Sequence, residues 1–120
     1  MSTLEVSNLN DGTTTVATTY VTNGSAKVWV TKNLDGTAIE DSVNVSSITD
    51  VGTGIATYTF TNNFANNTYQ FSTGSRHIGV RIYSSPDGDI TTSSLKINSY
   101  NLSEALSDRQ SGTAVHGDLA

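Results

Sequence analysis

Two histidines, many serines and a scatter of carboxylates are the residues of this sequence that could do chemistry. His77 and His116 would each need a serine and a carboxylate nearby to form a hydrolytic triad. They lie on separate predicted strands, and no serine stands in the Gly-x-Ser-x-Gly context that presents a nucleophile. We interpret His77 as a polar residue on an outer sheet face, and we expect no enzymatic activity.

Paired carboxylates are the other catalytic option, because sugar cleavage needs two acids flanking one bond. The candidates are Asp35, Glu40, Asp41, Asp87 and Asp89. No spacing marks any two as an acid–base pair, so the pattern favours turn residues. Asp87-Gly88-Asp89 offers oxygen ligands, but a calcium loop needs more of them at set spacing. Cysteine is absent, which excludes thiolate metal sites. We expect neither a metal nor another cofactor.

The only tryptophan lies in Asn23-Gly-Ser-Ala-Lys-Val-Trp-Val-Thr31, which opens on a hairpin-type Asn-Gly pair and then alternates. Val28 and Val30 fall on one side of the predicted strand, and Lys27 and Trp29 on the other. Trp29 is either core of a second sheet or an interface anchor. On the strand predicted over 55–61, threonines lie opposite a second apolar face. The candidates for contacts between subunits are Trp29, Lys27, Thr57 and Thr59.

Exposed loops are the natural place for a receptor contact. Asn62–Asn67 is a predicted loop with one apolar plug, and Ser84–Asp89 is a turn punctuated by Pro86. Arg81 and Tyr83 share an outer face beside that turn, where a solvated surface is the alternative. The receptor-facing candidates are Asn63, Phe64, Arg81, Tyr83, Asp87 and Asp89.

Length and composition set limits on the fold. The chain has 120 residues, one domain's worth, of which 35% are hydrophobic and 8% aromatic. Such a thin supply of core residues in a β-rich chain suggests that identical copies complete the burial. We therefore expect an oligomer.

The charge pattern limits the partners. The net charge is −5, and the six Lys and Arg residues are scattered, so no basic face for nucleic acid is visible. No apolar run reaches the ~20 residues of a membrane span. The first ten residues have neither a basic nor an apolar region of a secretion signal, so we expect synthesis and assembly in a cytoplasm.

Strand-like segments bounded by turn residues recur along the chain. The predicted strands are 13–22, 25–32, 37–46, 55–61, a short one from 69, 76–83, 91–100 and 114–116. The only helix candidate is Asn101–Asp108, with Asn101 as cap and Glu104 completing a capping box. This pattern predicts an antiparallel β-sandwich or barrel-like domain over residues 23–120. Residues 1–22 are expected to form a short extended attachment arm with Leu4, Val6 and Leu9 as its contacts.

Four segments resemble a module found in tail-fibre and other virion proteins of tailed phages, frequent among phages of marine and freshwater bacteria, cyanophages included. They are Asn23-Gly-Ser-Ala-Lys-Val-Trp-Val30, Asp41-Ser-Val-Asn-Val-Ser-Ser-Ile-Thr-Asp50, Gly52-Thr-Gly54 and the closing His116-Gly-Asp-Leu-Ala120, and Met1-Ser-Thr-Leu4 is similar too. The match is weak between residues 84 and 112.

The resemblance implies a β-rich homotrimer on the tail or fibre apparatus, without catalytic residues. Its partners would be its own copies, other virion proteins and a host cell-surface glycan. Capsid decoration is the alternative, because an extended arm could equally clamp neighbouring capsid subunits. A sugar-cleaving fibre enzyme is the least favoured class.

Overall fold

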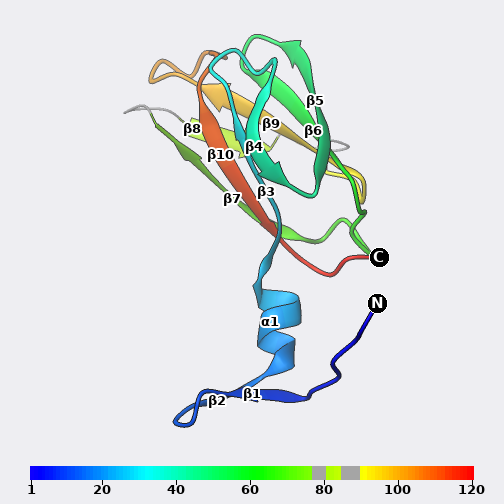
Figure 1. Cartoon of the computed structure of the whole chain (residues 1–120). Coiled ribbons are helices and arrows are strands. Elements are labelled where there is room, and N and C mark those ends of the chain that lie inside the picture. Colours follow the sequence, from blue (N-terminus) through cyan, green and yellow to red (C-terminus); the bar gives the residue numbers. More distant parts are fainter. Residues whose placement is uncertain (77–80, 85–89) are drawn as a thin grey trace.

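The computed structural model describes residues 1–76, 81–84 and 90–120, with the backbone alone for 81–84. Two four-stranded antiparallel sheets face each other (Figure 1). The first runs β4 (Ile39–Val43), β3 (Ala26–Lys32), β10 (Ser111–His116) and β7 (Gln70–Ser75). The second runs β5 (Val45–Gly52), β6 (Ile55–Phe60), β9 (Ser94–Tyr100) and β8 (Arg81–Ser84). The all-β, sandwich-like prediction is confirmed.

The core lies between the two sheets and follows the alternation of the strands. Period-2 patterning places every second side chain on the inner face, as in β6, where Ala56, Tyr58 and Phe60 are buried. The described core residues are Val28, Val30, Ala56, Tyr58, Phe60, Phe64, Tyr69, Leu95, Ile97 and Val115. The sandwich of a single chain therefore closes a core of its own.

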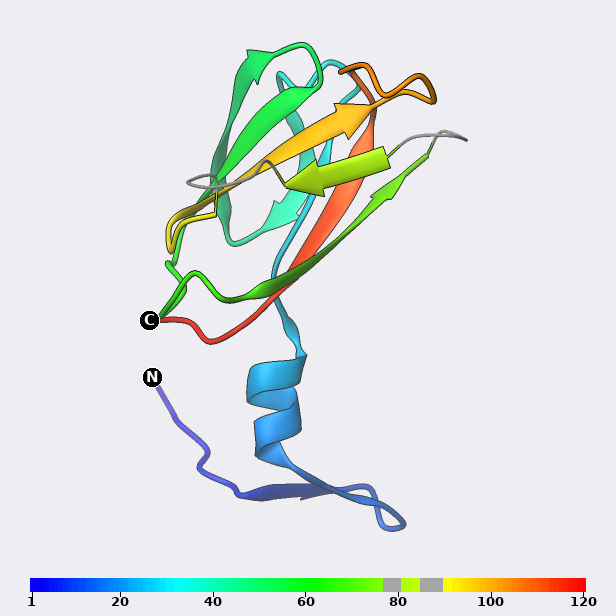
Figure 2. The ribbon, with the colours of Figure 1, turned by 180° about the vertical axis from the view of Figure 1, so that it is seen from behind.

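Residues 1–24, named here the N-terminal module, project from one end of the sandwich (Figures 1 and 2). The module contains a hairpin of β1 (Asn8–Asn10) and β2 (Thr15–Ala17), followed by the helix α1 (Thr18–Gly24). It helps give the chain its extents of 50 × 28 × 26 Å. The predicted strand over 13–22 is therefore wrong beyond Ala17, and Asn23-Gly24 ends a helix instead of forming a hairpin turn.

Asn44 joins β4, which belongs to the first sheet, to β5, which belongs to the second. Its backbone has φ 59°, a left-handed conformation that Asn tolerates better than most residues. Its Oδ1 accepts from the Asn62 backbone N–H at 2.7 Å, and its Nδ2 donates to the Asn62 carbonyl at 3.1 Å. The single strand predicted over 37–46 is wrong for this reason: β4 and β5 are two strands, in different sheets, joined at Asn44.

The segment after β9 is a loop, so the predicted helix over Asn101–Asp108 is wrong. Asn101 does cap, but it caps a turn: its Oδ1 accepts from the backbone N–H groups of Ser103 and Ala105 at 2.9 and 3.1 Å. Glu104 adopts φ 61°, which a helix cannot contain. The loop is held against the β5–β6 turn, where the Gly54 N–H donates to Asp108 Oδ1 at 2.6 Å.

The chain's last residues close the end of the sandwich nearest the module. The ring centroid of Phe64 lies 5.2 Å from that of Phe60 and 4.5 Å from that of Tyr69. The Tyr69 hydroxyl lies 3.0 Å from the carbonyl oxygens of both Thr91 and Ser94. Gly117 crosses this cluster so closely that a Cβ there would stand 2.7 Å from the Tyr69 Cβ. The segment His116–Ala120 therefore has a structural role: it covers the aromatic cluster at this end of the core.

The strand predicted over 76–83 and the turn predicted over 84–89 can be compared only in part. β7 ends at Ser75 and β8 starts at Arg81, so the strand predicted over 76–83 does not begin at Arg76. Residues 77–80 and the turn over 85–89 lie outside the described residues. The strand predicted over 91–100 is confirmed from Ser94 to Tyr100. The last strand, predicted over 114–116, begins already at Ser111 and lies inside its sheet, between β3 and β7.

Candidate functional site

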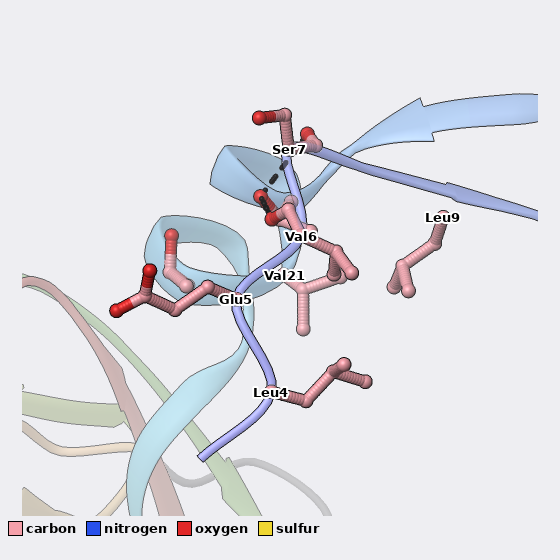
Figure 3. A pocket seen from close by; sticks show the side chains of 8 residues that line it. Leu4, Glu5, Val6, Ser7, Leu9 and Val21 are labelled. Carbon is pink, nitrogen blue, oxygen red and sulfur yellow. Dashed lines mark hydrogen bonds between the residues drawn. The ribbon is translucent and has the colours of Figure 1, made fainter.

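The N-terminal module contains a cleft lined by both apolar and polar side chains (Figure 3). Its volume is about 610 Å³. It is lined by Leu4, Glu5, Val6, Ser7, Leu9, Thr18, Val21 and Thr22. Figure 3 shows Leu4, Leu9 and Val21 around the open space, with the Glu5 carboxylate pointing away. All three residues expected as contacts of the attachment arm, Leu4, Val6 and Leu9, therefore border one cleft.

The helix α1 supplies the second wall of the cleft. Thr18, Val21 and Thr22 have the i, i+3, i+4 spacing that places side chains on one helix face. The Thr18 hydroxyl donates to the carbonyl oxygens of Val6 at 2.9 Å and Ser7 at 3.1 Å. The Thr18 N–H donates to the Ser7 carbonyl at 2.9 Å. These bonds hold the first ten residues against the helix and leave the apolar side chains outward.

The module has almost no burial of its own. No residue of α1 is buried, and its N-cap, Ala17, makes no side-chain hydrogen bond. Seven residues rich in β-branched side chains make a marginal helix in water, and a two-stranded hairpin alone is marginal too. Its exposed apolar residues are Leu4, Val6, Leu9, Val16, Tyr20 and Val21. The module thus carries apolar surface that only another molecule could cover.

The hairpin turn of the module is held by local hydrogen bonds. The Asp11 carboxylate accepts from the backbone N–H groups of Thr14 at 2.8 Å and Thr13 at 2.9 Å, and these bonds lower the pKa of Asp11. Gly12 has φ 97°, which requires glycine at this turn. The turn is therefore fixed by its sequence, although the module as a whole lacks a core.

The module meets the sandwich at the start of β3 and the end of β10. His116 Nδ1 lies 2.9 Å from the Gly24 carbonyl oxygen. The Ser25 hydroxyl donates to the Val21 carbonyl at 2.6 Å. Both contacts are polar and exposed, so the joint itself offers little apolar burial.

The candidates for contacts between subunits lie on opposite faces of the molecule. Trp29 is on the outer face of the first sheet and is 38% exposed. Thr57 and Thr59 are on the outer face of the second sheet, beside the buried Ala56 and Tyr58. Lys27 shares its strand with Trp29. Trp29 is therefore not core of a second sheet, and no single patch contains all four residues.

The receptor-facing candidates are only partly accessible. Phe64 is wrong as a surface residue: it is 1% exposed and packs in the aromatic cluster. Asn63 is exposed beside it, and its carbonyl accepts from the Ala120 N–H at 2.9 Å. The side chains of Arg81 and Tyr83, together with Asp87 and Asp89, lie outside the described part of the chain.

The described carboxylates have local structural partners. Asp35 accepts from the Thr37 hydroxyl at 2.8 Å, which lowers the pKa of that carboxyl. Glu40 accepts from Gln110 Nε2 at 2.6 Å, and Asp41 from the Ser42 N–H at 2.8 Å. Within the described ranges, no three metal-ligating side chains cluster. His77, the other histidine, is not among the described residues.

Lys32 is a buried cation at the far end of the sandwich, 2% exposed. Its ammonium donates to the Arg109 carbonyl. Desolvation lowers the pKa of Lys32, and the charges of Asp108, Asp35 and Asp50 oppose this shift. The contact holds the loop before β10 to the core, which is a structural role.

Sequence reasoning missed the helical wall of the cleft, Thr18, Val21 and Thr22. The signal was present: Thr18–Thr22 does not alternate apolar and polar residues, whereas positions 18, 21 and 22 fit a helix face. It also missed the residues beside Trp29, because nothing local shows that β10 and β7 lie next to β3. That proximity comes from the sheet order.

No protein-family model matches the chain, and the searches of curated proteins and of solved structures also gave no match. Among the described residues, no helix has the length and apolar character needed to cross a membrane.

Proposed function

We propose that the chain is a non-enzymatic structural protein of a tailed-phage virion, namely a tail fibre or fibre-tip protein that contributes to host attachment. The resemblance of four segments to phage fibre modules supports this class. The two-part construction supports the role: a sandwich with a closed core is carried on an N-terminal module that exposes apolar surface.

The cleft of the module, with its four exposed apolar side chains, is the observation that carries the attachment role. Its residues Leu4, Val6, Leu9 and Val21 are all exposed in the single chain. Burying a side chain of this kind contributes about 1.5–3 kcal/mol. Val6, Leu9 and Val21 are already about half buried, at 43–46% exposed, so each would contribute less than Leu4, which is 83% exposed. Together the four side chains give the module an apolar surface for another virion protein or for neighbouring copies.

The resemblance implies a homotrimer, and the same exposed surface supports contacts between copies. The sandwich has its own core, so the missing burial is in the module, and we expect the copies to meet there. Light scattering on the purified chain measures the assembly directly. A stable monomer that keeps an ordered module would contradict self-assembly.

The role of the cleft is tested by Leu4→Ser together with Val21→Ser. We expect loss of incorporation into particles in cells that produce the phage, with the sandwich still folded by circular dichroism. Leu34→Ser is the matched control, because Leu34 is a 53% exposed leucine on a turn of the sandwich. Equal incorporation of the natural protein, the double variant and the Leu34→Ser control would reject the cleft as the attachment surface.

Capsid decoration is the second candidate, since an apolar module could also bind between capsid subunits. Cryo-EM or immunogold labelling of the parent particle separates the two. Density or label at the tail supports a fibre, and label spread over the head supports decoration and eliminates the fibre.

A further inference from the structure

The outer face of the first sheet carries an exposed aromatic residue beside a hollow. One row across the strands, in register, is Val43, Trp29, Ala114 and Ser72. Trp29 is 38% and Val43 46% exposed, so the β4–β3 side of this row is an apolar surface open to solvent. The next row contains Thr31, Gly112 and Gly74.

The hollow exists because the strands next to Trp29 carry small residues. Its volume is about 370 Å³, and Trp29, Thr31, Ser72, Gly74, Gly112 and Ala114 are among its lining residues. A Cβ at Gly74 would meet nothing within 4 Å, and one at Gly112 only atoms at 3.9 Å or beyond. The indole therefore borders free space above a floor that is mostly backbone.

The chemistry of the lining selects a neutral ligand with hydroxyl groups. None of the lining residues is charged. The hydroxyls of Thr31 and Ser72 have no side-chain hydrogen bond among the described residues, so they are available as donors and acceptors. A pyranose ring has an apolar C–H face for the electron-rich face of an indole and a rim of hydroxyls for such groups.

The size of the face favours a glycan over a protein. Four strands about 4.8 Å apart and six residues long present roughly 300 Å². A stable protein interface needs about 800 Å² from each partner, whereas small-molecule sites begin near about 300 Å³. The hollow of about 370 Å³ falls at that lower limit.

We propose that this Trp29 face binds a neutral hexopyranose glycan, with the indole stacking on a sugar ring and Thr31 and Ser72 bonding its hydroxyls. The inference rests on the proposed attachment function and names the ligand class for it. A second copy of the chain seated on the same face is the competing occupant.

Trp29 is the only tryptophan, so its fluorescence reports on this face alone. The full-length protein is titrated with tetra- to hexasaccharides of glucose, galactose and mannose. We expect a saturable change in emission with at least one series. Gly74→Leu, which fills the hollow without removing the indole, should weaken this binding at least tenfold.

Gly52→Leu is the matched control, because Gly52 lies in β5 of the other sheet and also has open space around its Cβ position. It should bind like the natural protein, and circular dichroism checks that both variants fold. No emission change with any of the sugars overturns the proposal. Equal binding by Gly74→Leu overturns it too, as does dissociation of the oligomer in Gly74→Leu but not in Gly52→Leu, which would assign the face to a second copy. Particle imaging tests the virion role separately, so a tail location without sugar binding would reject this inference alone.

Discussion

Val21 and Val28 stand close together in the sequence, yet Val28 is fully buried and Val21 is 46% exposed. Val28 belongs to a strand with a neighbour on each side, the next strand along the chain, β4, and β10 from its distant C-terminal part. Val21 belongs to a helix that packs only on the first residues of the same module. The side chains of the two regions are similar. The regions differ in the number of helices and strands that pack against them.

This difference changes the part of the chain in which contacts between copies are expected. Composition alone suggests a shortage of apolar burial over the whole domain. In the structure the shortage is most complete in the N-terminal module, where no residue is buried, whereas the described inner faces of both sheets are filled. The sandwich is expected to fold alone, and the module is expected to become ordered fully on a partner.

The largest expected effect is in the aromatic cluster of the sandwich. Phe64→Ala removes a fully buried ring from contact with Phe60 and Tyr69, and such changes cost about 3–5 kcal/mol. Leu4→Ala in the module, where Leu4 is 83% exposed, should cost less than about 0.5 kcal/mol. Urea denaturation monitored by circular dichroism measures both. Similar costs would remove the distinction between the two regions.

Asn44 gives the next effect, since it lets the chain pass from one sheet to the other. Asn44→Ala loses the bonds to Asn62 and places alanine at φ 59°. We expect a loss of about 2–3 kcal/mol in the free energy of unfolding. Asn44→Gly keeps the backbone freedom and should recover about 1 kcal/mol of this. If glycine is no better than alanine, the left-handed backbone is not what the position requires.

The sequence predicts the strands of the sandwich better than it predicts their connections. β3, β6 and β9 were predictable because their alternation matches a two-layer core, as Val28, Tyr58 and Leu95 show. The strand break at Asn44 was not, because the alternation of apolar residues continues through Asn44, which turns the chain. The loop after β9 was missed because the Asn101 cap is the same in a turn as in a helix.

The candidate site was predictable in part. Leu4, Val6 and Leu9 stand out as isolated apolar residues in a polar segment, and they do border one cleft. Phe64 was wrong because an apolar residue in a polar loop has the same local appearance whether it faces solvent or plugs a core. The burial of Phe64 is decided by Gly117 and Tyr69, which no local pattern connects to it.

A pH titration gives a smaller effect, again in the sandwich. Burial raises the pKa of Tyr69 to about 12, against about 10 in the unfolded chain. The folded state holds this proton more tightly, so its contribution is complete below pH 10 and is lost as the pH rises toward 12. We expect a loss of about 2 kcal/mol over that window.

Tyr69→Phe should flatten the alkaline decline, measured as the free energy of unfolding between pH 9 and 12. Some slope will remain, because burial also raises the pKa of Tyr58. An unchanged slope in Tyr69→Phe would show that another group controls the alkaline transition. The exposed Tyr20 provides the control: Tyr20→Phe should leave the slope as it is.

Removing the whole N-terminal module is also expected to have a small effect on stability. Deleting residues 1–24 takes away no described core residue, and the hydrogen bonds lost to the rest of the chain are those of Gly24 with His116 and of Val21 with Ser25. The free energy of unfolding should therefore change by less than about 1 kcal/mol, while self-assembly and incorporation into particles are lost. A deleted protein that does not fold would make the module part of the core. One that folds and still assembles would move the contacts between copies to the outer faces of the sheets, because those are the surfaces that the deletion leaves intact.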